Sequence, residues 1–169
     1  MNTKGIIKDI GNREDHQRFI LNTLGIKLKE LEPVKYKKGI DDSYELRNDS
    51  TTKSLSKVLN LPYYQVLDKQ YKIAQKYGYL PTYIKVTKEI LRQNHYKATK
   101  FHAIDEISIA EFLYNHKKGK HIIIGGNHIF AYIDGVWYDN KSYFKFINQI
   151  ITQHIIFAFS YNEKGNKND

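Results

Sequence analysis

The chain has 169 residues, of which 41% are hydrophobic and 14% aromatic, enough for one domain with a sizeable core. It contains no cysteine, which excludes disulfides, thiolate zinc sites, iron–sulfur clusters and a cysteine nucleophile in this sequence. The net charge of +9 suits a polyanionic partner, but the lysines are spread almost evenly, so a solvated basic surface is the simpler interpretation.

The first half of the chain predicts helices. Residues 13–24 have apolar positions on one face and Gly25 behind them, which indicates a short helix. Residues 29–49 contain proline, glycine and a polar run, and are expected to form a loop or an extended lead-in. A second helix is expected to begin at Ser50 or just after it.

Further helices follow. Residues 62–77 place apolar side chains three and four positions apart, with Gly78 as the stop. Residues 86–94 indicate another short helix. Ser108 and Glu111 have the spacing of a capping box, in which the two side chains satisfy free amides at the start of a helix that runs to about residue 115.

The second half predicts antiparallel sheet. Residues 121–133 are rich in β-branched and aromatic side chains, and Asp134-Gly135 is a two-residue hairpin signal. A helix is expected after Ser142 and a last strand over 154–161. Residues 1–161 are therefore expected to form one α+β domain, with N-terminal helices packed on a C-terminal antiparallel sheet. Residues 1–40 form an extension with a helix in this interpretation, and 162–169 a disordered tail.

The first residues contain no apolar run of signal-peptide length, and no segment approaches the 18 apolar residues of a membrane span. We therefore expect a cytoplasmic protein. The histidines lack the spacing of metal ligands, and Gly125-Gly126 lacks the lysine and helix start of a phosphate loop. No metal or cofactor is expected.

Two segments carry candidate chemistry: Asn48-Asp49-Ser50 at a helix start, and the hairpin from His128 to Asp139. A nucleophile in the first turn of a helix lies where unpaired amides and the helix dipole favour negative charge. A histidine at the start of a buried strand has its ring oriented by packing, and a carboxylate on the paired strand can fix its tautomer.

The hairpin turn predicts how these two side chains lie. With a two-residue loop at Asp134-Gly135, residue i pairs with residue 269 − i, counted from the printed sequence. Asp139 is then a diagonal neighbour of His128 on one face of the sheet, within reach of its side chain, and Asn140 points to the other face. If the register slips by one, Asn140 takes the place of Asp139.

These two segments resemble small papain-like cysteine hydrolases of bacteria and phages, related to the NlpC-type peptidases. In such proteins an Asp-Cys pair opens a helix, and a later His heads a strand that continues through Asp-Gly to a final Asp. The resemblance covers about residues 45–140 and implies a papain-like fold. It implies that Ser50 stands at the nucleophile position, that His128 is the general base and acid, and that Asp139 orients it. The implied reaction is hydrolysis of a peptide, isopeptide or related amide bond in a protein or peptide substrate, within the cytoplasm, which for a phage protein is the host's.

The sequence departs from the family at two positions. Ser50 replaces the cysteine, and a hydroxyl ionises far less readily than a thiol, so little or no turnover is expected. Either the serine is an introduced inactivating substitution, or the protein is a natural, binding-only relative. Tyr44 stands where the family often has its glutamine oxyanion donor, so Asn48 is the candidate, together with the Ser50 amide.

Simpler interpretations remain beside these. Ser50 alone is most often a helix cap, and Asp134 a turn residue that the hairpin requires. The alternative function is a non-catalytic inhibitor or adaptor that uses its basic surface to bind an acidic protein or nucleic acid. Nucleic-acid binding is the least supported of these options.

Overall fold

The computed structural model describes residues 20–32 and 49–161 of the chain. Its strands are β1 (Lys27–Glu30), β2 (Tyr96–Lys100), β3 (Lys120–Gly125), β4 (His128–Ile133), β5 (Val136–Asp139) and β6 (Ile155–Tyr161). Its α-helices are α4 (Asp49–Leu59), α5 (Tyr63–Tyr77), α6 (Ile84–Gln93), α7 (Ile109–Asn115) and α8 (Ile147–Ile151). The 3₁₀ helices are η1 (Ala103–Asp105) and η2 (Lys141–Phe146).

The strands form one mixed six-stranded sheet in the order β1-β5-β4-β3-β6-β2. Neighbouring strands are antiparallel, as predicted, except that β1 runs parallel to β5, with Leu28 opposite Trp137. The expectation of a purely antiparallel sheet was therefore wrong at this edge. Of the loop or extended lead-in expected over residues 29–49, Lys29 and Glu30 are extended and belong to β1, and residues 33–48 lie outside the described residues.

Both edge strands are short and rich in lysine. The sequence of β1 is Lys-Leu-Lys-Glu and that of β2 is Tyr-Lys-Ala-Thr-Lys, and most of their side chains are exposed. Neither has the apolar alternation of a half-buried strand, which explains why the sequence did not indicate them.

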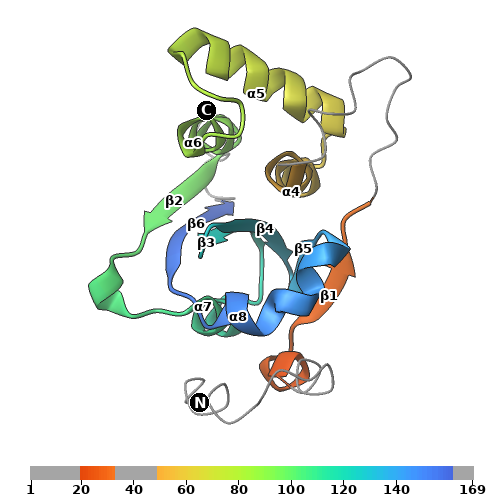
Figure 1. Cartoon of the computed structure of the whole chain (residues 1–169), viewed down its shortest axis with the longest axis vertical. Coiled ribbons are helices and arrows are strands. Elements are labelled where there is room, and N and C mark those ends of the chain that lie inside the picture. Colours follow the sequence, from red (N-terminus) through yellow and green to blue (C-terminus); the bar gives the residue numbers. More distant parts are fainter. Residues whose placement is uncertain (1–19, 33–48, 162–169) are drawn as a thin grey trace, which may run out of the picture.

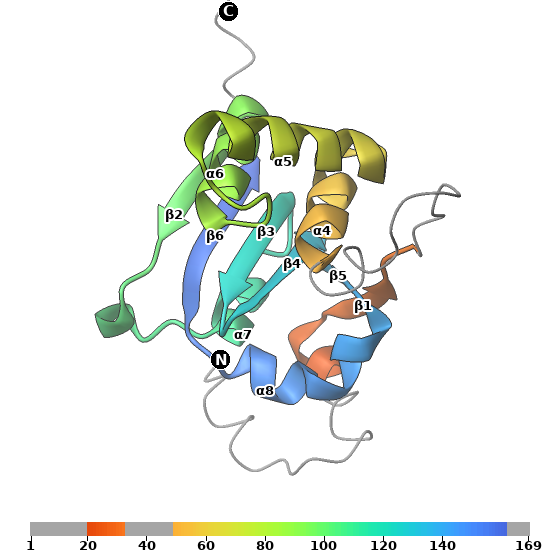
Figure 2. The same cartoon turned by 45° about the horizontal axis from the view of Figure 1, so that its top comes forward.

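Helices cover both faces of the sheet (Figures 1 and 2). α4, α5 and α6 lie on one face, with buried side chains that include Leu55 and Val58 packed against Ile122, Ala131 and Phe159. The expected packing of N-terminal helices on the sheet holds for this face. The opposite face is covered by α7, α8 and the helical residues 20–24, so helices of the second half of the chain complete the second layer.

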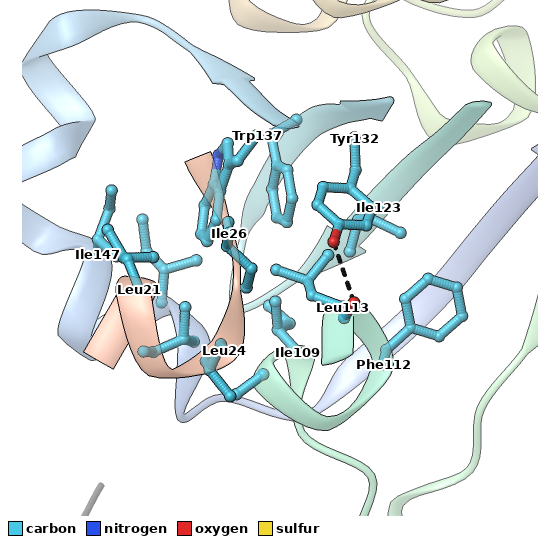
Figure 3. Packing of buried hydrophobic residues seen from close by; sticks show 14 of the residues in the cluster. Leu21, Leu24, Ile26, Ile109, Phe112, Leu113, Ile123, Tyr132, Trp137 and Ile147 are labelled. Carbon is cyan, nitrogen blue, oxygen red and sulfur yellow. Dashed lines mark hydrogen bonds between the residues drawn. The ribbon is translucent and has the colours of Figure 1, made fainter. Parts of the chain in front are cut away.

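Figure 3 shows the packing on this second face. Trp137 has no exposed surface and its ring stacks on that of Phe130, with 3.9 Å between centroids. The hydroxyl of Tyr132 donates a hydrogen bond to the carbonyl of Leu113 in α7 at 3.0 Å. A buried tyrosine needs such a partner, and here the bond fixes α7 on the sheet.

Predicted helix ends are confirmed where a cap or a stop marks them. Gly78 adopts the left-handed conformation after α5, and the Ser108 side chain accepts from the Glu111 amide at the start of α7. The helix expected after Ser142 begins as η2 and continues as α8.

Of the first predicted helix, residues 20–24 are helical, and the rest lies outside the described residues, as does the expected tail 162–169. No helix in the described ranges has the length and apolar character needed to cross a membrane.

Candidate functional site

The predicted hairpin register is confirmed. Ile133 pairs with Val136, Tyr132 with Trp137 and Ala131 with Tyr138, around a tight turn in which Asp134 and Gly135 both have positive φ. This register places His128 and Asp139 on one face.

His128 and Asp139 make a close, buried contact. Nε2 of His128 lies 2.6 Å from Oδ2 of Asp139, and the two side chains are 6% and 1% exposed. The His128 ring also lies against the ring of Tyr143 in η2, with 4.1 Å between centroids. Strand pairing and ring packing therefore hold the imidazole in one orientation.

Asp139 accepts further hydrogen bonds. Nε1 of Trp137 donates to its Oδ2 at 3.1 Å, and the backbone amide of Asn140 donates to its Oδ1 at 2.8 Å. An ionised carboxylate only accepts, so this pattern assigns the proton of a neutral His128 to Nε2. Nδ1 is then left as an acceptor, and it makes no hydrogen bond to another residue of the described ranges.

The first turn of α4 contains Ser50 and is tied to the end of β5. Oδ1 of Asp49 accepts from Nδ2 of Asn140 at 3.1 Å, and its Oδ2 pairs with Nζ of Lys53 at 2.8 Å. Lys53 also donates to Oδ1 of Asn140 at 3.2 Å. The start of the helix is thus fixed beside the residue that follows Asp139.

α4 nevertheless lies on the other side of the sheet from the His128–Asp139 pair. Side chains alternate along a strand, so His128 shares its face with Phe130 and Tyr132, which pack on α7 and α8. Ala131 points the opposite way and packs on α4. Among the described residues no hydrogen bond joins Ser50 to His128, so the structure brings His128 and Asp139 together and does not bring Ser50 to them.

The other predicted site residues divide in two. Asn140, the alternative to Asp139, points to the α4 face and contacts Asp49 and Lys53, as the register requires. Asn48, the oxyanion candidate, and Tyr44 lie outside the described residues. In the ranges 20–32 and 49–161, no group of three or more His, Asp or Glu side chains is placed to hold a metal ion.

A cleft lies between α4, the start of α5 and β1. We call it the α4–α5–β1 cleft; it has a volume of about 570 Å³ and was not anticipated from the sequence. Its lining side chains include Lys53 and Lys57 from α4, Tyr63 and Tyr64 from α5, Tyr138 from β5, and Lys29, Glu30, Leu31 and Glu32 from β1 and its continuation.

The cleft has walls of different chemistry. Its α4 side is basic, and the ammonium of Lys57 lies 4.6 Å from the centroid of the Tyr138 ring. The β1 side carries Glu30 and Glu32, and the start of α5 supplies aromatic surface. Such a cleft depends on the long-range pairing of β1 with β5, for which no local sequence signal exists.

The chain was compared with protein-family models, with curated proteins and with solved structures, and none of the three gave a match.

Proposed function

We propose that this chain is a non-catalytic interaction protein of the inhibitor or adaptor type, which binds a segment of a protein partner in the α4–α5–β1 cleft. The position of α4 carries the proposal, because the helix that contains Ser50 packs on the face of the sheet opposite the His128–Asp139 pair. A serine attacks a carbonyl only when a base lies within hydrogen-bond reach of its hydroxyl. The described side chains offer Ser50 no such contact with His128.

In this proposal His128 and Asp139 stabilise the fold. The carboxylate of Asp139 is buried and accepts hydrogen bonds from His128, Trp137 and the amide of Asn140 at once. A buried carboxylate needs several donors, and these hold the end of β5 in place.

The cleft suits an extended peptide. Within the described chain β1 pairs with β5 alone, so its other backbone edge has no strand beside it. A peptide that adds to such an edge gains main-chain hydrogen bonds, and its alternate side chains point toward one face. Here that face carries Lys29 and Tyr138, which lie opposite each other and line the cleft.

The absence of catalysis is tested with Ser50→Cys. The chain contains no other cysteine, so labelling by a thiol-directed electrophile reports position 50 alone. We expect slow labelling, at the same rate in the double variant Ser50→Cys, His128→Ala. Labelling that is at least tenfold faster in the single variant would mean that His128 activates the sulfur, and it would overturn the proposal.

The second candidate is the papain-like hydrolase, with Ser50 at the nucleophile position, His128 as base and Asp139 orienting it. The 2.6 Å contact between Nε2 of His128 and Oδ2 of Asp139 favours this candidate. The contact leaves Nδ1 of His128 as an acceptor, and a general base must accept a proton. Ser50 would have to reach Nδ1 around the end of β4. Fast, His128-dependent labelling supports this candidate, and equal labelling removes it.

Binding in the cleft is tested by selecting displayed peptides against the wild-type protein. The selected peptides should lose affinity at least tenfold for Lys57→Glu, which reverses a charge on the cleft wall. The matched control is Lys141→Glu, an exposed lysine in η2 that does not line the cleft. Equal loss in both variants, or no loss in either, would contradict binding in the cleft.

A further inference from the structure

The connection between α5 and α6 exposes large side chains that the core does not use. Tyr77 is 52% exposed, Leu80 70% and Tyr83 46%. They fall within seven residues of chain, counted from the printed sequence. Single exposed apolar residues need no explanation, but a cluster of them marks a binding surface.

The rings of this connection form an ordered row. Tyr77 and Tyr79 stack with 6.3 Å between centroids and 24° between planes. Tyr79 and Tyr83 follow with 5.3 Å and 40°. Tyr79 is half-buried and packs against the core, so it anchors the row while the outer two rings face solvent.

Buried hydrogen bonds fix the backbone beneath the row. Gly78 ends α5 in the left-handed conformation, and the amide of Tyr79 donates to the carbonyl of Ala74 at 2.9 Å. Gln70 has no exposed surface; its Nε2 donates to the carbonyl of Pro81 at 3.3 Å, and its Oε1 accepts from Thr52 of α4 at 2.7 Å. A surface held in this way loses little conformational entropy on binding.

Lysines stand beside the rings. Nζ of Lys76 lies 5.2 Å from the Tyr77 centroid, and Nζ of Lys85 lies 5.0 Å from the Tyr79 centroid and donates to the Tyr79 hydroxyl at 3.2 Å. Two acidic residues on these helices already have cationic partners: Asp68 pairs with Lys72 at 2.7 Å, and Glu89 with Arg92 at 2.7 Å. The charge left over beside the rings is therefore positive.

We propose that this surface, made of Lys76, Tyr77, Tyr79, Tyr83 and Lys85, binds single-stranded nucleic acid. Bases stack on the outer faces of the exposed tyrosines, and the lysines neutralise phosphates of the same strand. An acidic protein surface also satisfies lysines and contacts tyrosines, but stacking on a row of rings beside free positive charge is the combination that single-strand binders use. In a duplex the base faces are already stacked on one another, so its phosphates can contact the lysines but its bases cannot stack on the tyrosines.

This surface is separate from the α4–α5–β1 cleft. Tyr63 of the cleft begins α5 and Tyr77 ends it. At a rise of 1.5 Å per residue, the two ends of the helix are roughly 20 Å apart. Figure 2 shows α5 running between these ends above α4 and α6. The proposal is therefore independent of whether the cleft binds a peptide or Ser50 takes part in a reaction.

The test is fluorescence anisotropy with a labelled oligothymidylate of 20 nucleotides and with a labelled duplex of the same length. We expect tighter binding to the single strand, with a logarithm of affinity that falls linearly with the logarithm of salt concentration. The double variant Tyr77→Ala, Tyr83→Ala should weaken single-strand binding by roughly fivefold or more for each ring. Lys76→Gln with Lys85→Gln should make the salt dependence less steep.

The matched control is the double variant Lys120→Gln, Lys141→Gln. It removes the same number of positive charges from exposed positions outside the proposed surface. It should change affinity by less than about twofold, and circular dichroism should show that every variant is folded. Four results would overturn the proposal: no single-strand binding at low salt, equal loss in the control, equal affinity for the duplex, or unchanged affinity in the tyrosine variant. Polyglutamate that binds more tightly than the oligonucleotide and depends on the same tyrosines would assign the surface to an acidic protein instead.

Discussion

Nε2 of His128 lies 2.6 Å from Oδ2 of Asp139, on the face of the sheet that α4 does not cover. Both side chains are buried, so we expect their contact to contribute to the stability of the folded protein. Trp137 donates to the same carboxylate oxygen, so the pair belongs to a buried polar cluster at the end of the β4–β5 hairpin.

Asp139→Ala should therefore destabilise the protein strongly. The substitution leaves the donors of His128, Trp137 and the Asn140 amide without their acceptor in a buried site. We expect a loss of about 3 kcal/mol in the free energy of unfolding, measured in urea. Asp68→Ala breaks an exposed pair in α5 and should cost less than about 1 kcal/mol. Similar losses in the two variants would contradict a structural role for Asp139.

The Thr52–Gln70 hydrogen bond should couple α4 to the α5–α6 connection. Thr52→Val keeps the shape of the side chain and removes the donor to Oε1 of Gln70, which is buried. An acceptor left unsatisfied in the core costs about 1–3 kcal/mol, so urea unfolding should show a loss in this range. Amide hydrogen exchange should also become faster over residues 78–83, while exchange in β3 keeps its wild-type rate. Unchanged exchange in the connection would show that Gln70 does not hold it.

Stability should fall in mild acid because of His121. Burial holds the pKa of this imidazole below its ordinary value, and the nearby His116 adds to the effect, against the opposing influence of the Lys118 carbonyl and Asp134. The unfolded chain then binds a proton from about pH 6.5 downward while the folded chain resists it. The contribution of His121 to the free energy of unfolding is therefore complete above about pH 6.5. It is lost as the pH falls toward the lower pKa that His121 has in the folded protein.

The measurement is urea unfolding between pH 7.5 and pH 5. His121→Gln should flatten this part of the stability profile relative to the wild type. His154→Gln, at an exposed histidine, is the matched control for the replacement of an imidazole by a carboxamide. A profile for His121→Gln as steep as that of the wild type would rule out His121 as the group that titrates.

The hairpin and its polar pair could be predicted because a two-residue turn fixes the register over several residues. The helices α5 and α7 could be predicted because Gly78 and Ser108 mark their ends. The position of α4 could not. Ile129, Ala131 and Ile133 are apolar, and so are Phe130 and Tyr132, so both faces of β4 are suited to helix packing. The choice of face for α4 depends on the whole sheet.

Gly126 should be more sensitive to substitution than Gly78. Both have positive φ, of 56° and 70°, in which a side chain costs about 1 kcal/mol. At Gly78 an added Cβ meets nothing within 4 Å, whereas at Gly126 it falls 1.1 Å from Oε1 of Gln153. Gly126→Ala should therefore lose more stability than Gly78→Ala, because the buried carboxamide of Gln153 must also move.

A double-mutant cycle separates the two costs at Gly126. In a Gln153→Ala background the side chain that Cβ would meet is absent, so Gly126→Ala should cost about as much as Gly78→Ala does in the wild type. The coupling energy between positions 126 and 153 should then exceed about 0.5 kcal/mol, as for residues in direct contact. A coupling energy near zero, from urea unfolding of the four proteins, would mean that the loss at Gly126 comes from the backbone alone.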